Sequence, residues 1–505
     1  MKRDVILAAV AAVLGCAGGA AIACDFVHGN AEEGFGKHMN NIGNGGEVNL
    51  ANMPPQAWNM QFLSQVTLSQ MAAAQGLSAT LSVAGSSMWG WVDPLTHREY
   101  AIIGRNRGTT FVDISNPKSP VIVASLANAS STATSWREPK VVGNRAFIGV
   151  DGTTHGVQAV NLELLRNYAG TPLTLTTTSA GQGGIYNGVT RQHTLAINAT
   201  GGVAQTSPDG KQYVYVAGSN LQSGGIHAID VTNYVNNPNT ATMTFAGGHS
   251  ADGYTHEMQV LTYNGPDRAF RGKEIALAFN GKSGTTIDTF SIVDVTNKSA
   301  MSRISSATYP QAGYIHQGWI TPDHRYVIQN DELDETGGLT GGLTRTHFWD
   351  ISSLSNPVYK GFYAHPGTSV DHNLYVKGDL VYMSNYTMGL RVFRLNDLAS
   401  ADPSDWLAPV AFFDTYAAND NATFNGAWNN YPFFPSGTIA ISDINGGLIL
   451  TKLDLPKKFL GELSPETLNL MQTEFRNAMA RATVPEPASL GLLIPAAAMV
   501  LRRRR

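Results

Sequence analysis

The residues best suited to chemistry lie at one recurring position of a repeated sequence pattern. Strand-like segments recur in seven units, and the first segment of each unit begins near a histidine or a tryptophan. In chain order these residues are Trp89, Trp136, His193, His256, His316, His372 and Trp428, at intervals of 47 to 63 residues. Neutral imidazole is a good ligand for Zn, Cu, Fe and Ni. Four histidines in consecutive units therefore predict a metal site wherever the fold brings the units together.

A second set of possible ligands is the acidic run Asn330-Asp331-Glu332-Leu333-Asp334-Glu335, which is followed by Gly337-Gly338 and Gly341-Gly342. Carboxylates on such a loop predict a site for Ca²⁺ or another hard cation, with Asp331, Glu332 and Asp334 as ligands. The alternative is an ordinary solvated loop, and no EF-hand spacing is present. Asp371 and Glu257 each adjoin a histidine of the recurring position and are expected to support or join a metal site.

Several tryptophans could bind an organic ligand by stacking. Trp89, Trp136, Trp319 and Trp428, together with Asp371, are the candidates for contact with a sugar or an aromatic molecule. The alternative is that the repeated histidine and tryptophan residues serve packing and hydrogen bonding between structural units, and that Asn and Asp at strand ends are ordinary turn residues.

Other catalytic signatures are missing from the sequence. It contains no Gly-x-Ser-x-Gly elbow, no P-loop and no dinucleotide-binding glycine motif. Thr255-His256-Glu257 lacks the second histidine of a His-Glu-x-x-His zinc site. An enzymatic activity would therefore have to come from residues that the fold gathers from several units.

The units that carry these residues have the pattern of β-propeller blades. One copy is Glu99 to Arg105, a turn and Thr110 to Ile114; segments of this alternating, β-branched kind, separated by Gly, Asn and Asp, are strands in hairpins. Four strands per unit predict an all-β, seven-bladed propeller over residues 59–455, in preference to an array of β-sandwiches. The segment Asn59 to Leu68 is expected to supply the outer strand of the seventh blade and so close the ring.

Composition agrees with a turn-rich all-β fold and limits the partners. Only 14% of the 505 residues are charged and the net charge is −4, against roughly 25% charged residues in average soluble proteins. The sequence has no basic stripe outside its termini, which argues against nucleic acid as a partner. Residues 24–58 are predicted to be a loosely ordered lead-in, and residues 465–481, within a 456–483 linker, are predicted to form a helix that begins with Ser464 as its N-cap.

The N-terminus has the pattern of a secretory signal. Met1-Lys2-Arg3 precedes an apolar run, and the small residues that end at Ala23 fit a cleavage site, so residues 1–23 are predicted to be removed on export. Cleavage there would leave Cys24 first, and its lipidation is an alternative that a loose motif leaves open. Cys16 and Cys24 are the only cysteines, so the mature chain can form no internal disulfide.

The C-terminus resembles the PEP-CTERM sorting signal of Gram-negative bacteria. Pro485, Glu486 and Pro487 precede the short apolar segment Leu490 to Leu501 and four arginines, within residues 484–505. The apolar segment is too short for a permanent membrane span. The resemblance implies transient membrane contact, processing by an exosortase-type enzyme and a final place in the envelope, on the outer surface or in the extracellular matrix.

The repeats themselves resemble the choice-of-anchor B proteins, exported propellers with LVIVD-type repeats. The matching segments, between Asn59 and Leu453, include Ser87 to Pro94, Thr110 to Ile114, His316 to Trp319 and Asp371 to Asn373. The resemblance implies a surface-associated propeller and supplies no reaction. The leading interpretation is a binding or scaffold module for a polysaccharide or a protein. The alternative is a metal-dependent hydrolase or oxidoreductase with the four histidines as ligands and Zn²⁺ or Ca²⁺ as the cofactor.

Overall fold

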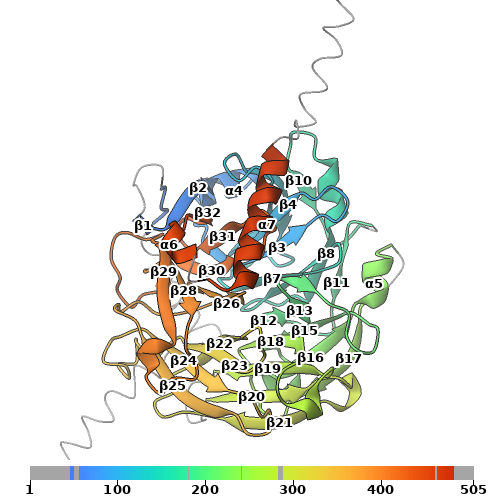
Figure 1. The fold of residues 1–505 in the computed structure, drawn as a ribbon. Coiled ribbons are helices and arrows are strands. Elements are labelled where there is room, and N and C mark those ends of the chain that lie inside the picture. The colour runs from blue at the N-terminus through green and yellow to red at the C-terminus, as the bar shows by residue number, and fades with distance from the viewer. Residues whose placement is uncertain are drawn as a thin grey trace, which may run out of the picture.

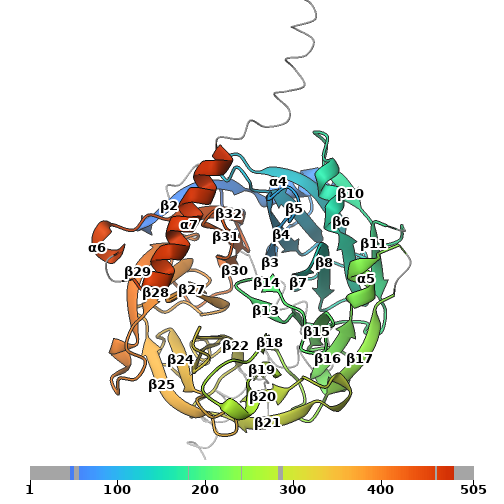
Figure 2. The same ribbon diagram turned by 45° about the vertical axis from the view of Figure 1, so that its right-hand side comes forward.

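Seven sheets, built mainly of antiparallel strands, stand in a ring around a central axis (Figures 1 and 2). This computed structural model describes residues 46–50, 56–179, 181–239, 242–281, 288–460 and 463–482. The innermost strand of each sheet contacts the innermost strands of both neighbours, and the contact between the first and the seventh closes the circle. The predicted seven-bladed propeller is confirmed. The predicted signal peptide, residues 1–23, and the predicted sorting signal, residues 484–505, lie outside the described residues.

Blades one to four follow one another in sequence, each built from the inside outwards. Blade one contains β3 (Gly85–Val92), β4 (Glu99–Arg105), β5 (Gly108–Asp113) and β6 (Val121–Ala127). Blade two contains β7 (Arg137–Val142), β8 (Arg145–Val150), β9 (Val157–Asn161) and β11 (Gly183–Tyr186). Blade three contains β12 (Thr194–Ala196), β15 (Tyr213–Ala217), β16 (Ile226–Asp230) and β17 (Thr244–His249). Blade four contains β18 (Glu257–Thr262), β19 (Glu274–Asn280), β20 (Thr289–Asp294) and β21 (Ser302–Ala307).

The last three blades complete the ring. Blade five contains β22 (Ile315–Ile320), β23 (Tyr326–Asp331), β24 (Arg345–Asp350) and β25 (Val358–Ala364). Blade six contains β26 (Leu374–Lys377), β27 (Leu380–Ser384), β28 (Leu390–Leu395) and β29 (Leu407–Phe413). Blade seven contains β30 (Ala427–Tyr431), β31 (Thr438–Asp443), β32 (Gly447–Leu453) and, as its outer strand, β2 (Met60–Val66). The N-terminal strand pairs antiparallel with β32, as the sequence predicts.

Four further short strands are present among the described residues. β10 (Leu173–Leu175) adds a parallel strand to the outside of blade one, and β1 (Ala57–Trp58) adds a fifth strand to blade six. β13 (Ala199–Thr200) and β14 (Val203–Ala204) form a separate hairpin. The remaining elements are the helices α4 (Leu68–Ala74), α5 (Thr232–Asn236), α6 (Lys457–Leu460) and α7 (Pro465–Ala482), and the 3₁₀ turns η1 (Leu162–Asn167), η2 (Gln222–Gly224), η3 (Arg268–Phe270), η4 (Lys298–Ala300) and η5 (Pro403–Asp405).

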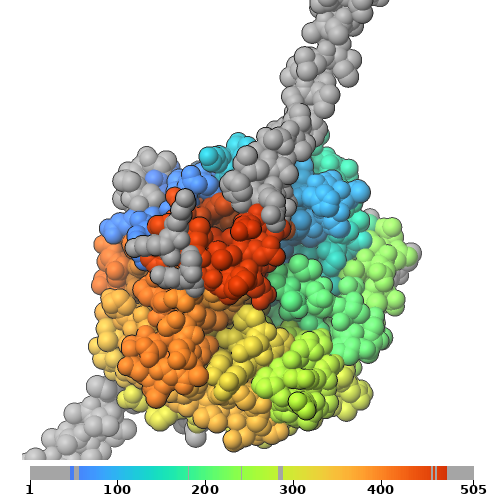
Figure 3. Space-filling model, viewed as in Figure 1, coloured from blue at the N-terminus to red at the C-terminus, as the bar shows by residue number. Residues whose placement is uncertain are grey.

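The C-terminal helix forms where the sequence predicts it. Ser464 accepts a hydrogen bond from the Thr467 backbone N–H at 3.2 Å and so caps α7. Further along the helix, Glu474 forms an ion pair with Lys377, the last residue of β26. Since the recurring histidines lie at the opposite ends of the inner strands, α7 covers the other face of the propeller (Figure 3). Within the described part of the chain, no helix has both the length and the apolar character of a membrane span.

The ion pair between blades one and two should make the fold sensitive to acid. Two nitrogens of Arg166 donate to the buried carboxylate of Asp93, the shorter contact at 2.5 Å. Burial raises the pKa of Asp93, but hydrogen bonds from Arg166 and Thr96 outweigh it and lower the pKa to about 2. Because an unfolded Asp titrates near ~3.9, the pair stabilises the fold above that pH and loses its effect as the pH falls towards 2.

We therefore expect Asp93→Asn to lower the free energy of unfolding by ~1 to 2 kcal/mol at pH 7, a value reduced for the partial exposure of Arg166. About half of the difference from the wild type should remain at pH 3. Urea denaturation at both pH values measures it. The control is Asp113→Asn, because the Arg98 partner of Asp113 is 40% exposed and such a pair contributes less than ~1 kcal/mol. An equal loss at both pH values would contradict the assignment.

Candidate metal centre

The recurring side chains that line the pocket lie in a bulge at the start of an inner strand or just before that strand. In β22, Ile315 pairs with Asp331 and Gln317 with Asn330, so His316 has no partner residue. Trp428 is the corresponding extra residue in β30. A residue in such a bulge is re-aimed relative to the regular alternation of the strand. His193 and His256 immediately precede β12 and β18, and His372 lies two residues before β26.

The four histidines form one continuous arc, as predicted from their spacing. We call His193, His256, His316 and His372 the histidine arc. Successive ring centroids are 4.1, 4.5 and 4.2 Å apart. Two imidazoles bound at right angles to one ion through bonds of about 2.1 Å would have centroids about 4.6 Å apart. Neighbouring pairs of rings therefore have a spacing compatible with one shared ion, and the ligand atoms of His256, His316 and Glu332 lie within 4.8 Å of one another.

Neighbouring residues hold the Nδ1 side of three of these rings. His193 Nδ1 lies 3.0 Å from a carboxylate oxygen of Asp151. His256 Nδ1 lies 2.8 Å from the Tyr314 hydroxyl, and His372 Nδ1 lies 2.6 Å from the backbone carbonyl of Trp428. Metal-binding histidines are usually oriented by such a contact at the nitrogen that does not bind the metal. The Nε2 atoms are thus the available ligand atoms, and His256 Nε2 is buried without a hydrogen bond among the described residues.

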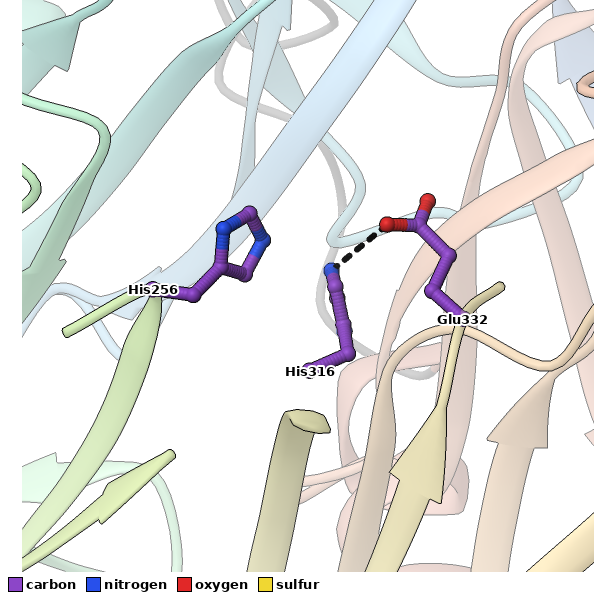
Figure 4. Close-up of side chains that lie close together, drawn as sticks. All are labelled: His256, His316 and Glu332. Carbon is purple, nitrogen blue, oxygen red and sulfur yellow. Dashed lines mark ion pairs between the residues drawn. The ribbon is translucent and has the colours of Figure 1, made fainter. Parts of the chain in front are cut away.

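Glu332 adds a carboxylate to the histidine arc. One of its oxygens lies 3.6 Å from His316 Nε2, as Figure 4 shows, and the other lies 3.6 Å from His372 Nε2. Two bonds of about 2.1 Å that meet at an ion with an angle near 120° separate their donors by about 3.6 Å. The Tyr386 hydroxyl donates to Glu332 at 2.7 Å and fixes its position. Burial raises the pKa of Glu332 to about 7.

The electrostatic surroundings keep His256, His316 and His372 neutral. Burial, followed by the neighbouring imidazoles, lowers the pKa of His256 and that of His316 well below the usual value. Burial also lowers the pKa of His372 to about 3, against the effect of its hydrogen bond to Trp428. These three rings are therefore uncharged at neutral pH, and uncharged imidazole is the form that binds metal ions.

A small pocket with a cavity volume of about 30 Å³ opens beside the arc. Its other side is lined by residues of blades one, two and seven, among them Ser86, Ser87, Trp136, Arg137 and Trp428. Trp136 and Trp428 flank the two ends of the arc, with ring centroids 6.2 Å from His193 and 5.0 Å from His372. A ligand of a few atoms in this pocket would contact the histidines on one side and residues such as Ser86, Ser87 and the two tryptophans on the other.

Two predicted tryptophans lie elsewhere, and this corrects the alignment of blade one. β3 has its irregularity between Gly85 and Met88, so Ser86 and Ser87 occupy the pocket position and Trp89 lies further along the strand. Trp89 pairs with Ile102 as Trp319 pairs with Ile328, three residues beyond the bulge. Both tryptophans pack against Tyr375, at 6.1 and 4.9 Å between ring centroids. They belong to an aromatic layer below the pocket and not to its lining.

The acidic run divides between two places. Glu332 lines the pocket, whereas Asp331 and Asp334 gather with His347 at a separate buried point, where their ligand atoms lie within 4.8 Å of one another. The alternative of a solvated loop is wrong for these residues, because Asp331 is 0% and Asp334 is 1% exposed. Asp371 is buried near these carboxylates as well, since its backbone enters blade six beside blade five.

Sequence reasoning missed the residues that orient the arc. Tyr254 and Tyr314, which both contact His256, each stand two residues before a histidine of the arc, so a repeated Tyr-x-His pattern was present in the sequence. Tyr386, which positions Glu332, and His347, which lies in the third strand of blade five, carry no such spacing signal. Glu257 lines the pocket and accepts a hydrogen bond from the Thr194 hydroxyl at 2.8 Å.

Comparison with known protein families identifies one sequence repeat in this chain. A family model described as the LVIVD repeat matches residues 98–127, which cover β4, β5 and β6 of blade one. The chain is a β-propeller with an LVIVD repeat. No curated protein matches this LVIVD propeller.

Solved structures similar to the LVIVD propeller share little sequence with it. Hydrazine synthase of Kuenenia stuttgartiensis is 12% identical with a TM-score of 0.48, over 76% of this chain and 99% of that chain. The Cps50 (Swd1) β-propeller domain of Myceliophteria thermophila is 10% identical with a TM-score of 0.43, over 74% and 99%. A protein from Lactobacillus plantarum is 12% identical with a TM-score of 0.40, over 71% and 87%. The architecture of the LVIVD propeller rests on its own strand pairings.

Proposed function

We propose that this propeller binds a first-row transition-metal ion through the histidine arc and brings a small ligand to that ion in the adjoining pocket. The observation that supports this most is the orientation of the arc: partners hold Nδ1 of His193, His256 and His372, so the Nε2 atoms are left for a metal. Rings that served only to pack the blades together would not need this common orientation.

The donor set favours a particular class of metal. Neutral imidazole nitrogens suit Zn, Cu, Fe and Ni, whereas Ca²⁺ takes six to eight oxygens. Two imidazoles and a carboxylate whose ligand atoms lie within 4.8 Å of one another suit any of these four transition metals. Glu332 supplies either an oxygen ligand or a base for a water molecule bound to the ion. A metal-dependent oxidoreductase or hydrolase is therefore the activity that we propose for this pocket.

Metal analysis of the full chain tests this function. We expect about one transition-metal ion per chain at the arc, with the visible or EPR spectrum of a nitrogen-coordinated site if the ion is Cu²⁺. His256→Ala and His316→Ala should each abolish it. The control is His97→Asn, since His97 is exposed and has φ of 58°, a conformation that Asn tolerates. A wild-type protein that takes up no transition metal, or variants that retain it, would contradict the proposal.

The partner of His193 provides a finer prediction. Replacing Asp151 by Asn keeps the shape of the side chain but removes the charge that orients the imidazole. Changes of this kind usually weaken metal binding by ~10- to 100-fold. Competition with a chelator of known affinity measures the effect. Thermal denaturation of the metal-free protein is the control, because a variant that lost affinity through misfolding would also unfold at a lower temperature.

We further propose that the propeller is exported and retained at the envelope or in the matrix, where its pocket meets its ligand. The N-terminal signal pattern and the C-terminal resemblance to a sorting signal support this location. Mass spectrometry of the protein isolated from its source is expected to find an N-terminus at Cys24 and a C-terminus processed near Pro485. Intact ends in a cytoplasmic fraction would contradict it.

The tryptophans at both ends of the arc favour a sugar as a second candidate ligand, through stacking on indole rings.

Binding of a polysaccharide without chemistry is the second candidate function. Trp136→Ala and Trp428→Ala should then weaken retention on immobilised envelope polysaccharide, while His256→Ala should leave retention unchanged. If all three variants weaken retention equally, sugar binding requires the metal and the two functions share one site.

A further inference from the structure

A second group of potential ligands lies outside the pocket. We call Asp331, Asp334, Glu335, Asp371 and His347 the acid cluster. It is assembled from the end of β23, the loop that follows, β24 and the loop before β26, so blades five and six both contribute. Every member is at most 5% exposed. The histidine is the residue that distinguishes this group from an ordinary run of acidic side chains.

Three carboxylates of the acid cluster are buried without hydrogen-bond donors among the described residues. Neither carboxylate oxygen of Asp334, Glu335 or Asp371 receives a hydrogen bond from any described residue. His347 Nε2 also has no hydrogen bond and lies 3.5 Å from an oxygen of Asp334. Buried polar groups are almost always paired, and buried charges are paired or bind metals. Several unsatisfied groups that face one another therefore need a common partner.

The rest of the structure holds these side chains in place. Asp331 accepts hydrogen bonds from the Tyr309 hydroxyl at 2.5 Å and from the Gly313 backbone N–H at 2.8 Å. His347 Nδ1 lies 2.9 Å from the Tyr359 hydroxyl, and Tyr309 stacks on the imidazole with ring centroids 4.4 Å apart. As in the histidine arc, a tyrosine at Nδ1 leaves Nε2 as the free ligand atom.

We propose that the acid cluster is a second metal site, which binds a divalent cation of the kind that takes carboxylate oxygens together with one imidazole, such as Mn²⁺ or Zn²⁺. Its ligands are Asp331, Asp334 and His347, with Asp371 and Glu335 available to complete the coordination sphere. The cation offsets the repulsion between carboxylates that lie out of water. The site is closed, since its residues are buried and none lines the pocket, so its role is structural.

A cation in the acid cluster would also hold Glu332 in place beside the histidine arc. Asp331 and Glu332 are consecutive residues, and Glu332 serves the histidine arc while Asp331 serves the acid cluster. A cation bound by Asp331 would anchor the backbone from which Glu332 reaches the pocket. The inference does not rest on the proposed function, because the two ligand sets share no residue.

The alternative is a cluster without metal, in which the carboxyl groups hold protons. Burial, followed by the charge of Asp371, raises the pKa of Glu335, and burial raises that of Asp334 to about 7. Protonated carboxyl groups can hydrogen-bond to one another, whereas a cation requires them ionised. Metal content and the effect of removing one carboxylate distinguish the two states.

Elemental analysis of the full chain, loaded with Zn²⁺ or Mn²⁺ and freed of excess ions, is the test. Asp334→Asn and His347→Ala should each lose about one ion per chain and retain the ion that His256→Ala removes. Asp420→Asn, an exposed change of the same kind, should lose none. A wild-type protein whose only ion is lost with His347→Ala would support this site and contradict the proposed function.

Thermal denaturation distinguishes a variant that has lost a metal ligand from one that binds metal poorly because it is misfolded. Asp334→Asn should lower the melting temperature of the metal-loaded protein and leave unchanged or raise that of the metal-free protein, where it removes a crowded carboxylate. The inference is overturned if the metal-loaded wild type and Asp334→Asn contain equal amounts of metal, or if the variant melts lower to the same extent with and without metal.

Discussion

Deletion of Met60–Val66 is expected to abolish folding of the whole propeller, and Val66→Asp is expected to have nearly the same effect. β2 pairs through six residues with β32. Its two ends are buried, Val66 in the core shared with blade one and Met60 in the core of blades six and seven. Without β2 the ring has a gap, and blade seven presents an unpaired edge.

The expected loss is as large as the stability of the protein. Burial of two such side chains contributes ~3 to 6 kcal/mol, and the ladder with β32 adds ~0.5 to 1.5 kcal/mol for each hydrogen bond. Gln65 also binds the Gly446 carbonyl at 2.7 Å, and Ser64 binds the Pro117 carbonyl at 2.6 Å. The sum, about 10 kcal/mol, is similar to the ~5 to 15 kcal/mol of a typical domain.

Gln61→Asp on the same strand is the matched control, because Gln61 is exposed. It should change the free energy of unfolding by less than ~0.5 kcal/mol. Size-exclusion chromatography and urea denaturation compare the three chains. A folded, monomeric Val66→Asp protein with near wild-type stability would show that the ring does not depend on this strand.

Glu274→Gln is expected to destabilise the protein by ~3 to 5 kcal/mol, the usual cost of removing one partner from a buried ion pair. Glu274 is 0% exposed and binds the Lys298 ammonium at 2.7 Å. It also accepts a hydrogen bond from the Ser207 hydroxyl of blade three at 2.8 Å. The variant leaves the Lys298 charge buried against Tyr213, with 4.3 Å between the ammonium and the ring centroid.

The double variant Glu274→Gln/Lys298→Met isolates the pair. Because it removes both charges, we expect it to recover ~1 to 3 kcal/mol of the loss seen with Glu274→Gln alone. Chemical denaturation of the wild type, both single variants and the double variant gives the coupling energy. Additive effects would mean that the two side chains act independently. The exposed pair of Lys211 and Asp230 offers a comparison, where a change to Asn at Asp230 should cost less than ~1 kcal/mol.

The fold was readable from the sequence because its signal is repeated. Alternation and turn residues place the hairpins, and seven similar units leave the propeller as the economical arrangement. The position of β2 followed from a simple count, since blade seven lacked a strand and the lead-in had one to spare. β10 and β1 were not predicted, because each is a short segment whose pairing depends on tertiary contact and not on its own pattern.

The site was only partly readable. The recurrence of histidine at the start of the first strand in four consecutive units identified the histidine arc, since strands of the same rank occupy equivalent places in a ring. Spacing could not locate Trp89, because the bulge in β3 shifts the register and gives its pocket position to Ser86 and Ser87. The spacing of residues also could not show that Asp331 and Glu332 face different groups of side chains, or that His347 lies with Asp331. Those facts depend on which way neighbouring side chains point after the loop folds.

The pairing of Met60 with Leu453 has a consequence for how the chain folds. Apart from the two-residue β1, β2 is the first described strand of the ring to be synthesised, and β32 is the last. β2 must therefore wait, with its edge unpaired, until almost the entire propeller has followed. Contacts between residues so far apart in the chain form slowly, and an open intermediate with a free strand edge is prone to aggregation. Blades one to six can form from strands that are close in the sequence. Blade seven needs both β2 and β32, so the ring can close only after β32 has been synthesised.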